Sequence, residues 1–307
     1  MVFDRRTLVV PKNTKFEEHN IVTTGDVVVG DRALVRFGIK TDGRIFIGEH
    51  AIVDGALDAS GDIRVDSFSN IGGDVDSGGD VYFGEKCKVN GKLSLDGDLD
   101  VGDSVEIDEG FEAKGWINIR SPIPVVIYIF IYLVQMLKMG HSEEIERILE
   151  EMEKNEGDTI PISETFFYIP NNSIIGIQKS KLDWNIRIGK KSKIIGNFDV
   201  KGNVFIEEKT VFHGSINTNG EVYCGPKTSI KGNIKADGDV EIDEKCKVDG
   251  DITGKKIFMA KNAVVQNELY AKNGVSFNIN KKVKVEDKVQ RFEKNVDVVD
   301  DVKNMLE

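Results

Sequence analysis

The sequence has few of the residues that build covalent or metal-centred folds. Its 307 residues include 3 cysteines and 4 histidines. Three cysteines are too few for a disulfide framework in a chain of this length. Basic residues are also in the minority, at 41 against 52 acidic ones, which gives a net charge of -11. Because nucleic-acid binding is driven by neutralising phosphates, we expect no nucleic-acid partner.

Motifs for phosphate binding are missing as well. Neither G-x-G-x-x-G nor G-x-x-x-x-G-K-S/T occurs, so we expect no nucleotide and no other cofactor. Gly-Asp pairs are frequent, but calcium-binding β-rolls repeat every nine residues or so, and this sequence does not. We therefore expect no metal site and no catalytic residue. An apolar fraction of 40% excludes a disordered acidic chain.

What the sequence does have is glycine at a fixed interval. One series recurs every 18 residues without an insertion, and it restarts after residue 180. Its members are Gly25, Gly43, Gly61, Gly79, Gly97 and Gly115, then Gly202, Gly220 and Gly238. A period of this length indicates stacked structural repeats.

Apolar residues keep the same interval. Positions 3 and 5 of each unit, counted from the glycine, are apolar throughout. These pairs are Val27/Val29, Ile45/Ile47, Ile63/Val65, Val81/Phe83, Leu99/Val101, Ile117/Ile119, Ile186/Ile188, Val204/Ile206, Val222/Cys224, Val240/Ile242 and, after a one-residue deletion near Gly254, Ile257/Met259. Alternation of this kind predicts short strands with two side chains pointing inward.

Two further alternating pairs follow in most units at intervals of six residues. The first is usually small then β-branched, and the second is large then small. Cys87 and Cys246 fall in the small slot and Cys224 in another inward slot, so we expect buried thiols and a reducing compartment. Three strands per 18 residues predict an all-β fold of triangular parallel β-helices, in which each coil completes the core of the next.

The chain divides into four predicted segments. A first β-solenoid covers residues 1–120, a hydrophobic and amphipathic helical insertion 121–164, a second solenoid 165–285, and an amphipathic C-terminal helix 286–307. The formal charge is -9 for residues 1–120, -6 for 121–164 and +4 for 165–307. This division is either surface drift, or a sign that an acidic solenoid meets a basic one within or between chains.

The insertion contains an uncharged stretch between Arg120 and Lys138. Its centre is the candidate membrane or oligomer contact, namely Val125, Val126, Ile127, Tyr128, Ile129, Phe130, Ile131, Tyr132, Leu133 and Val134. Nineteen residues from Ser121 to Met139 would make a helix of about 28 Å, at the lower edge of a membrane span. A helix buried in an oligomer or against a solenoid end, and an extra buried strand, remain as alternatives.

The remaining expectations concern the C-terminus and the location of the protein. The predicted C-terminal helix would cover the last coil, since an open solenoid end is an unpaired sheet edge, or else offer a partner surface. The first residues lack the apolar core of a signal peptide. We therefore expect a cytoplasmic protein associated with the membrane.

Several stretches of the second half resemble the bactofilin family. They are 200–206, 230–242 and 246–252, where Gly-Asn and Gly-Asp turns separate the alternating pairs, and residues 51–63 match more loosely. The resemblance implies a right-handed β-helix that polymerises end to end without nucleotide into membrane-associated filaments, acting as a scaffold and not as an enzyme. The tandem arrangement, the apolar insertion and the C-terminal helix depart from that pattern.

Two other functions compete with the scaffold. One is a non-polymerising protein that binds partners or organises a membrane. The other is a hexapeptide-repeat acyltransferase, whose aliphatic-Gly-x-x-small motif occurs at 29–33, 47–51 and 188–192. Such enzymes need a histidine beside a protruding loop, whereas these coils run without loop insertions.

Overall fold

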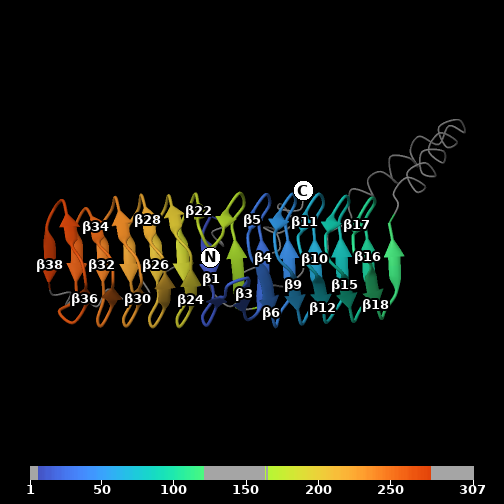
Figure 1. Ribbon diagram of the computed structural model, residues 1–307, viewed down its shortest axis with the longest axis horizontal. Helices are drawn as coiled ribbons and strands as arrows, with labels where there is room; N and C mark the ends of the chain where they lie inside the picture. The colour runs from blue at the N-terminus through green and yellow to red at the C-terminus, as the bar shows by residue number, and fades with distance from the viewer. Residues whose placement is uncertain (1–5, 121–162, 164, 278–307) are drawn as a thin grey trace, which may run out of the picture.

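The computed structural model describes residues 6–120, 163 and 165–277, and within these it contains strands and turns but no helix. The chain winds into a parallel β-solenoid of about 12 turns with 18-residue coils, seen as a straight rod in Figure 1. Each coil contributes one strand to each of three sheets. The all-β prediction with 18-residue coils is confirmed.

The strands of each sheet lie side by side along the rod. The first sheet has 14 strands, which are, from one end to the other, β19 (Ile117–Ile119), β16 (Leu99–Val101), β13 (Val81–Phe83), β10 (Ile63–Val65), β7 (Ile45–Ile47), β4 (Asp26–Val29), β20 (Phe166–Ile169), β1 (Leu8–Val10), β23 (Ile186–Ile188), β26 (Val204–Ile206), β29 (Val222–Cys224), β32 (Val240–Ile242), β35 (Ile257–Met259) and β38 (Val275–Phe277).

The second sheet has 12 strands, which are β17 (Glu106–Ile107), β14 (Lys88–Val89), β11 (Asn70–Ile71), β8 (Ile52–Val53), β5 (Leu34–Val35), β21 (Ile174–Ile175), β22 (Ser180–Leu182), β25 (Phe198–Val200), β28 (Ile216–Thr218), β31 (Ile234–Ala236), β34 (Ile252–Gly254) and β37 (Leu269–Ala271). The third, also of 12, has β18 (Phe111–Ala113), β15 (Leu93–Leu95), β12 (Val75–Ser77), β9 (Leu57–Ala59), β6 (Gly38–Thr41), β3 (Asn20–Thr23), β2 (Lys15–Phe16), β24 (Lys193–Ile195), β27 (Val211–His213), β30 (Ser229–Ile230), β33 (Lys247–Val248) and β36 (Val264–Val265).

Neighbouring coils pair in the register that the glycine interval predicts. Ile45 lies opposite Ile63, and Val204 lies opposite Val222, each one period away. The deletion near Gly254 is real, because Val240 pairs with Ile257 at an interval of 17. Identical register along the rod lets inward side chains of successive coils stack directly on each other.

The core follows these inward columns. Of the apolar residues predicted at positions 3 and 5, all are buried except Val101, Ile117 and Ile119. These exceptions lie in the outermost two coils of the first half, where fewer coils cover them. The three cysteines are free and buried as predicted, with relative exposures of 0–1%.

The sequence left open how the two predicted β-helices pack, and in the structure the two halves form one continuous rod. β1, from the start of the first half, pairs in parallel with β23 of the second half. β20, from the start of the second half, pairs in parallel with β4 of the first. The opening strand of each half therefore belongs to the solenoid of the other, and not to its own.

The next strands repeat this exchange. β2 pairs with β24 of the second half, and β21 pairs with β5 of the first. Where the exchanged turns meet, β1 and β20 run antiparallel, so the N-terminal end of one half faces the N-terminal end of the other. In Figure 1 β1 accordingly lies near the middle of the rod, with β19 and β38 at its two ends.

Reciprocal exchange has a physical cause in the solenoid itself. The first coil of any solenoid leaves one row of backbone donors and acceptors unpaired, and such an edge pairs with any available strand. Two edges facing each other satisfy both rows. The predicted helices at 121–164 and 286–307 lie outside the described residues, apart from Ser163.

Candidate assembly surfaces

The Gly-Asp turns serve the stacking of coils. Asp62 Oδ1 accepts the backbone N–H of Asp80 at 2.9 Å, and Asp80 Oδ1 accepts that of Asp98 at 2.8 Å, one coil further on. Asparagine does the same in the second half, where Asn185 Oδ1 accepts the N–H of Asn203 at 2.7 Å. The side chain after the glycine is therefore a backbone acceptor, which is the usual use of Asp and Asn in turns.

A second ladder occupies the small inward slot. Ser69 Oγ donates to Gly48 O at 2.8 Å, and Thr210 Oγ1 donates to Gly189 O at 3.1 Å. The thiols of Cys87 and Cys246 donate to the equivalent carbonyls at 3.0 and 2.9 Å. Sequence reasoning identified this slot as small but missed its polarity. The signal was present in the repeated Ser, Thr and Cys, which each satisfy a buried carbonyl.

Burial of the three cysteine side chains keeps their thiols protonated. Burial raises the pKa of the Cys87 and Cys246 thiols to about 11 and also raises that of Cys224 well above its usual value, so the reactive thiolate is disfavoured. The cysteines are structural members of the core. Within the described residues there is also no cluster of three or more side chains suited to hold a metal.

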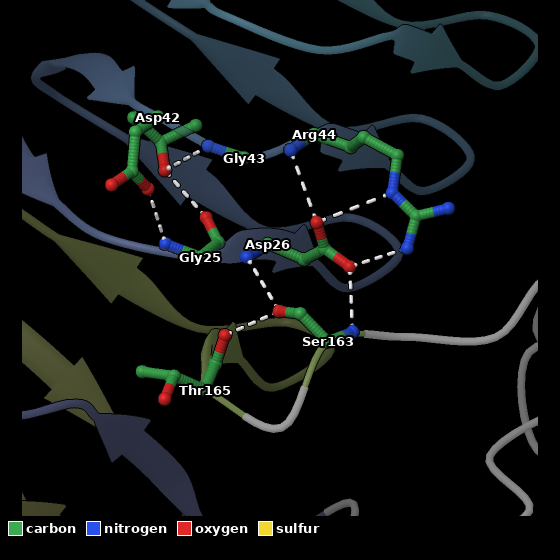
Figure 2. A network of polar contacts seen from close by, with 8 residues as sticks. Gly25, Asp26, Asp42, Gly43, Arg44, Ser163 and Thr165 are labelled. Carbon is green, nitrogen blue, oxygen red and sulfur yellow. Dashed lines mark hydrogen bonds and ion pairs between the residues drawn. The ribbon is translucent and has the colours of Figure 1, made fainter.

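The junction between the halves contains the most buried charge in the described structure (Figure 2). The Asp26 carboxylate accepts the Arg44 side chain at 2.6 and 3.2 Å and the Arg44 backbone N–H at 3.0 Å. Ser163, where the chain enters the second half, donates its N–H to Asp26 Oδ2 at 2.8 Å and accepts the Asp26 N–H on Oγ at 3.0 Å. Asp26 thus ties both halves together.

The electrostatics at Asp26 favour its charged form. Burial alone would raise the pKa of this carboxyl, but the Arg44 side chain and the two backbone N–H donors outweigh it and lower the pKa below 3.8. Next to it, Gly25 has φ +80°, and a Cβ there would meet Thr165 O at 1.9 Å. Only glycine allows the two chain segments to approach so closely.

One coil departs from the glycine pattern, at Asp66. Glycine stands at the equivalent positions of neighbouring coils, Gly48 and Gly84. Asp66 Oδ2 is buried without a hydrogen-bond partner among the described residues. Burial raises the pKa of Asp66 to about 6; Arg64 opposes the rise, while the carboxylates of Asp31 and Glu49 add to it. Three other buried side-chain atoms of the described residues also lack a hydrogen-bond partner, namely Arg64 Nε, Asn70 Oδ1 and Asp100 Oδ1.

The two ends of the rod are the largest unsatisfied features of the described chain. β17, β18 and β19 end the three sheets on one side, and β37, β36 and β38 end them on the other, each with a single neighbour. Large apolar side chains are exposed at both ends. At the first end these are Phe111, Trp116, Ile117 and Ile119, with 47–85% exposure, and at the second Val264, Tyr270 and Phe277, with 49–58%.

The candidate contact residues of the insertion, 125–134, lie outside the described residues. Among the described residues no helix is long and apolar enough to cross a membrane. Sequence reasoning predicted an unpaired edge at the last coil of the second half. It did not single out the equivalent edge at the end of the first half.

The fold and these surfaces define a class, the parallel β-solenoid with 18-residue coils and open ends. Residues 174–270 match the family model of bactofilin, described as polymer-forming cytoskeletal, and this part of the chain is a bactofilin domain. The match covers about a third of the chain, and the family, which is cytoskeletal and not enzymatic, implies a structural, polymer-forming role for this domain. No curated protein and no solved structure matches the chain.

Proposed function

We propose that the whole chain is a bactofilin-like scaffold that self-associates through its solenoid ends without nucleotide, with the right-handed coil that the resemblance implies. The observation that supports this is the pair of open ends, where all three sheets stop with exposed apolar side chains. At such an end, the unpaired backbone groups can pair with the edge strands of another solenoid, and the apolar side chains can pack against its core.

The test is assembly of the purified full chain without added nucleotide. We expect it to pellet on ultracentrifugation and to form unbranched filaments in negative-stain micrographs, with no change on adding ATP or GTP. A single discrete species at all concentrations would contradict the scaffold. Acyl-CoA binding by such a species would instead favour the acyltransferase.

We further propose that residues 121–139 associate with a membrane, which the uncharged sequence between Arg120 and Lys138 supports. Deleting the insertion would be a poor test. Six strand spacings separate β19 from β20 in the first sheet, about 29 Å at roughly 4.8 Å each, and the connection must cover that distance.

Substitutions are therefore the better test. Replacing Ile129, Ile131 and Leu133 with Asn should abolish co-flotation with lipid vesicles while leaving the solenoid melt unchanged. Ile52→Asn, at an exposed strand position, is the matched control and should float like the unmodified protein. Equal flotation of all three proteins would remove the membrane proposal.

A further inference from the structure

Both ends of the rod are the C-terminal ends of their halves. This follows from the exchange at the centre, where the two N-terminal ends are already paired with each other through β1 and β20. No N-terminal edge remains open in the described structure. End-to-end contact between copies must therefore join two C-terminal ends, with strands running antiparallel across the contact, as β1 and β20 do.

The two ends have opposite charge. Residues 97–120, at the first end, include seven acidic and two basic side chains. Residues 254–277, a window of equal length at the second end, include four basic and one acidic. We refer to these as the acidic end and the basic end.

Ion pairs with preceding coils involve both signs at the acidic end, where Glu106 and Asp108 contact Lys88 and Glu112 contacts Lys92. Lys114 and Arg120, the two basic residues of the acidic end, already form ion pairs with Asp96 and Asp100 of the preceding coil. At the basic end, no ion pair among the described residues involves Lys255, Lys261 or Lys272. The acidic end thus has no basic side chain to spare, while the basic end has lysines available for a partner.

An exposed aromatic group accompanies the charge at each end. Trp116 stands one period after Asp98, at the position where earlier coils have an aspartate acceptor, and it is 85% exposed. Tyr270 and Phe277 are more than half exposed at the basic end. Aromatic side chains are enriched in protein–protein interfaces and often contribute most of their binding energy.

We propose that the acidic end of one copy binds the basic end of the next copy, so that assembly is head-to-tail with respect to the tandem chain. This rests on the proposed self-association and specifies its interface. Contact between two acidic ends or two basic ends would place like charges together, which disfavours association. Because the two contacting surfaces differ and the rod is straight, the contact propagates into an open linear polymer.

Charge reversal at each end separately tests the pairing in the full chain. One variant replaces Glu106, Glu109 and Glu112 of the acidic end with Lys. The other replaces Lys255, Lys261 and Lys272 of the basic end with Glu. All six side chains are exposed. Among the described residues, Glu106 forms an ion pair with Lys88 and Glu112 forms one with Lys92. A control variant replaces Glu17, Glu18 and Asp54, exposed and away from both ends, with Lys.

We expect each end variant alone to need at least about tenfold more protein for assembly, a loss equivalent to about 1.4 kcal/mol per contact. An equimolar mixture of the two should assemble again, since every acidic surface then finds a basic one. The chain that combines both sets should also assemble. The control variant should behave like the unmodified protein, and assembly should weaken with added salt.

The outcomes separate this inference from the proposed function. If the unmodified chain does not assemble, for instance because its own residues outside the described ranges cover an end, both fail. If it assembles and the Lys variant of the acidic end assembles better, contacts join like ends and only the head-to-tail inference is overturned. Failure of the mixture to assemble would also overturn it, provided that each variant melts like the unmodified protein.

Discussion

At the scale of single residues, the repeated polar side chains bind the backbone of the neighbouring coil. Asp and Asn accept N–H groups at the turns, while Ser, Thr and Cys donate to carbonyls at the inward slot. Each bond satisfies a backbone group that a strand of two or three residues leaves without a partner. The sequence revealed where these residues recur, but the partner atoms required the register of adjacent coils.

Asp66 is the residue whose replacement should stabilise the protein. Its pKa is raised to about 6, so the folded state favours the protonated form. The ionised carboxylate of Asp66 therefore lowers the free energy of unfolding. This penalty is absent below the unfolded pKa near 3.8 and is complete once the pH has risen through about 6. Asp66→Asn should therefore raise the free energy of unfolding by about 1 to 2 kcal/mol at pH 8, a figure discounted for partial solvent exposure.

The measurement is urea denaturation of the full chain at pH 8 and at pH 4. The gain from Asp66→Asn should shrink to a small fraction at pH 4, where the folded carboxyl is protonated and the unfolded one is close to its own pKa of 3.8. Asp54→Asn, at an exposed turn, should change stability by less than about 0.5 kcal/mol at either pH. An equal gain at both pH values would show that charge at Asp66 is not the cause.

Asp26 should have the opposite effect. Because the pKa of Asp26 is lowered in the folded state, its carboxylate stabilises the fold at pH values above the unfolded pKa. This stabilisation is lost as the pH falls through the folded-state pKa. Asp26→Asn leaves the Arg44 guanidinium, 25% exposed, without its carboxylate, and we expect a loss of about 2 kcal/mol at pH 7. Thermal denaturation at pH 7 and at pH 3 measures it.

Asp58→Asn provides the comparison for Asp26. It removes an ion pair with Lys40 in which both side chains are exposed, and water screens such pairs so that they contribute little to stability. Similar losses at Asp26 and Asp58 would mean that the junction network adds no more than a surface ion pair does.

At the scale of strands and coils, the same inward column has different roles at the centre and at the ends. Ile242 in β32 is fully buried between neighbouring coils, whereas Ile119 in β19 occupies the equivalent column position and is 71% exposed. Position in the stack, and not residue type, decides whether an apolar side chain belongs to the core or to a contact surface.

Truncating these two isoleucines should separate folding from assembly. Ile242→Ala should cost about 2 to 5 kcal/mol of folding stability, because a buried side chain leaves a cavity. Ile119→Ala should change the melting temperature little but raise the concentration needed for assembly. Thermal melts and pelleting of both variants measure the two effects, and a large drop in melting temperature for Ile119→Ala would place it in the core.

At the scale of the whole molecule, periodicity predicted the coil, the three strands and the inward columns, since these depend on local alternation and a constant interval. It did not predict the exchange of opening turns. Leu8–Val10 and Phe166–Ile169 read as ordinary first strands, and nothing local says which solenoid each one joins.

The exchange changes what the rod presents to other molecules. Two separate solenoids would offer four edges, whereas the described part of the chain, one rod with a closed centre, offers two, both C-terminal and of opposite charge. The difference in charge between the two halves is therefore found at the two ends, where copies of the chain would meet. Random variation of surface residues would not need to place it there.

Electron cryomicroscopy of the assembled full chain tests the central claim most directly. Fourteen strands of the first sheet, continued across the contact at roughly 4.8 Å each, give an axial repeat of about 67 Å. We expect unbranched filaments with this repeat and one orientation of the tandem chain along each filament. Discrete rods at all concentrations, or filaments whose repeat is twice this length because neighbouring copies alternate in direction, would contradict the account.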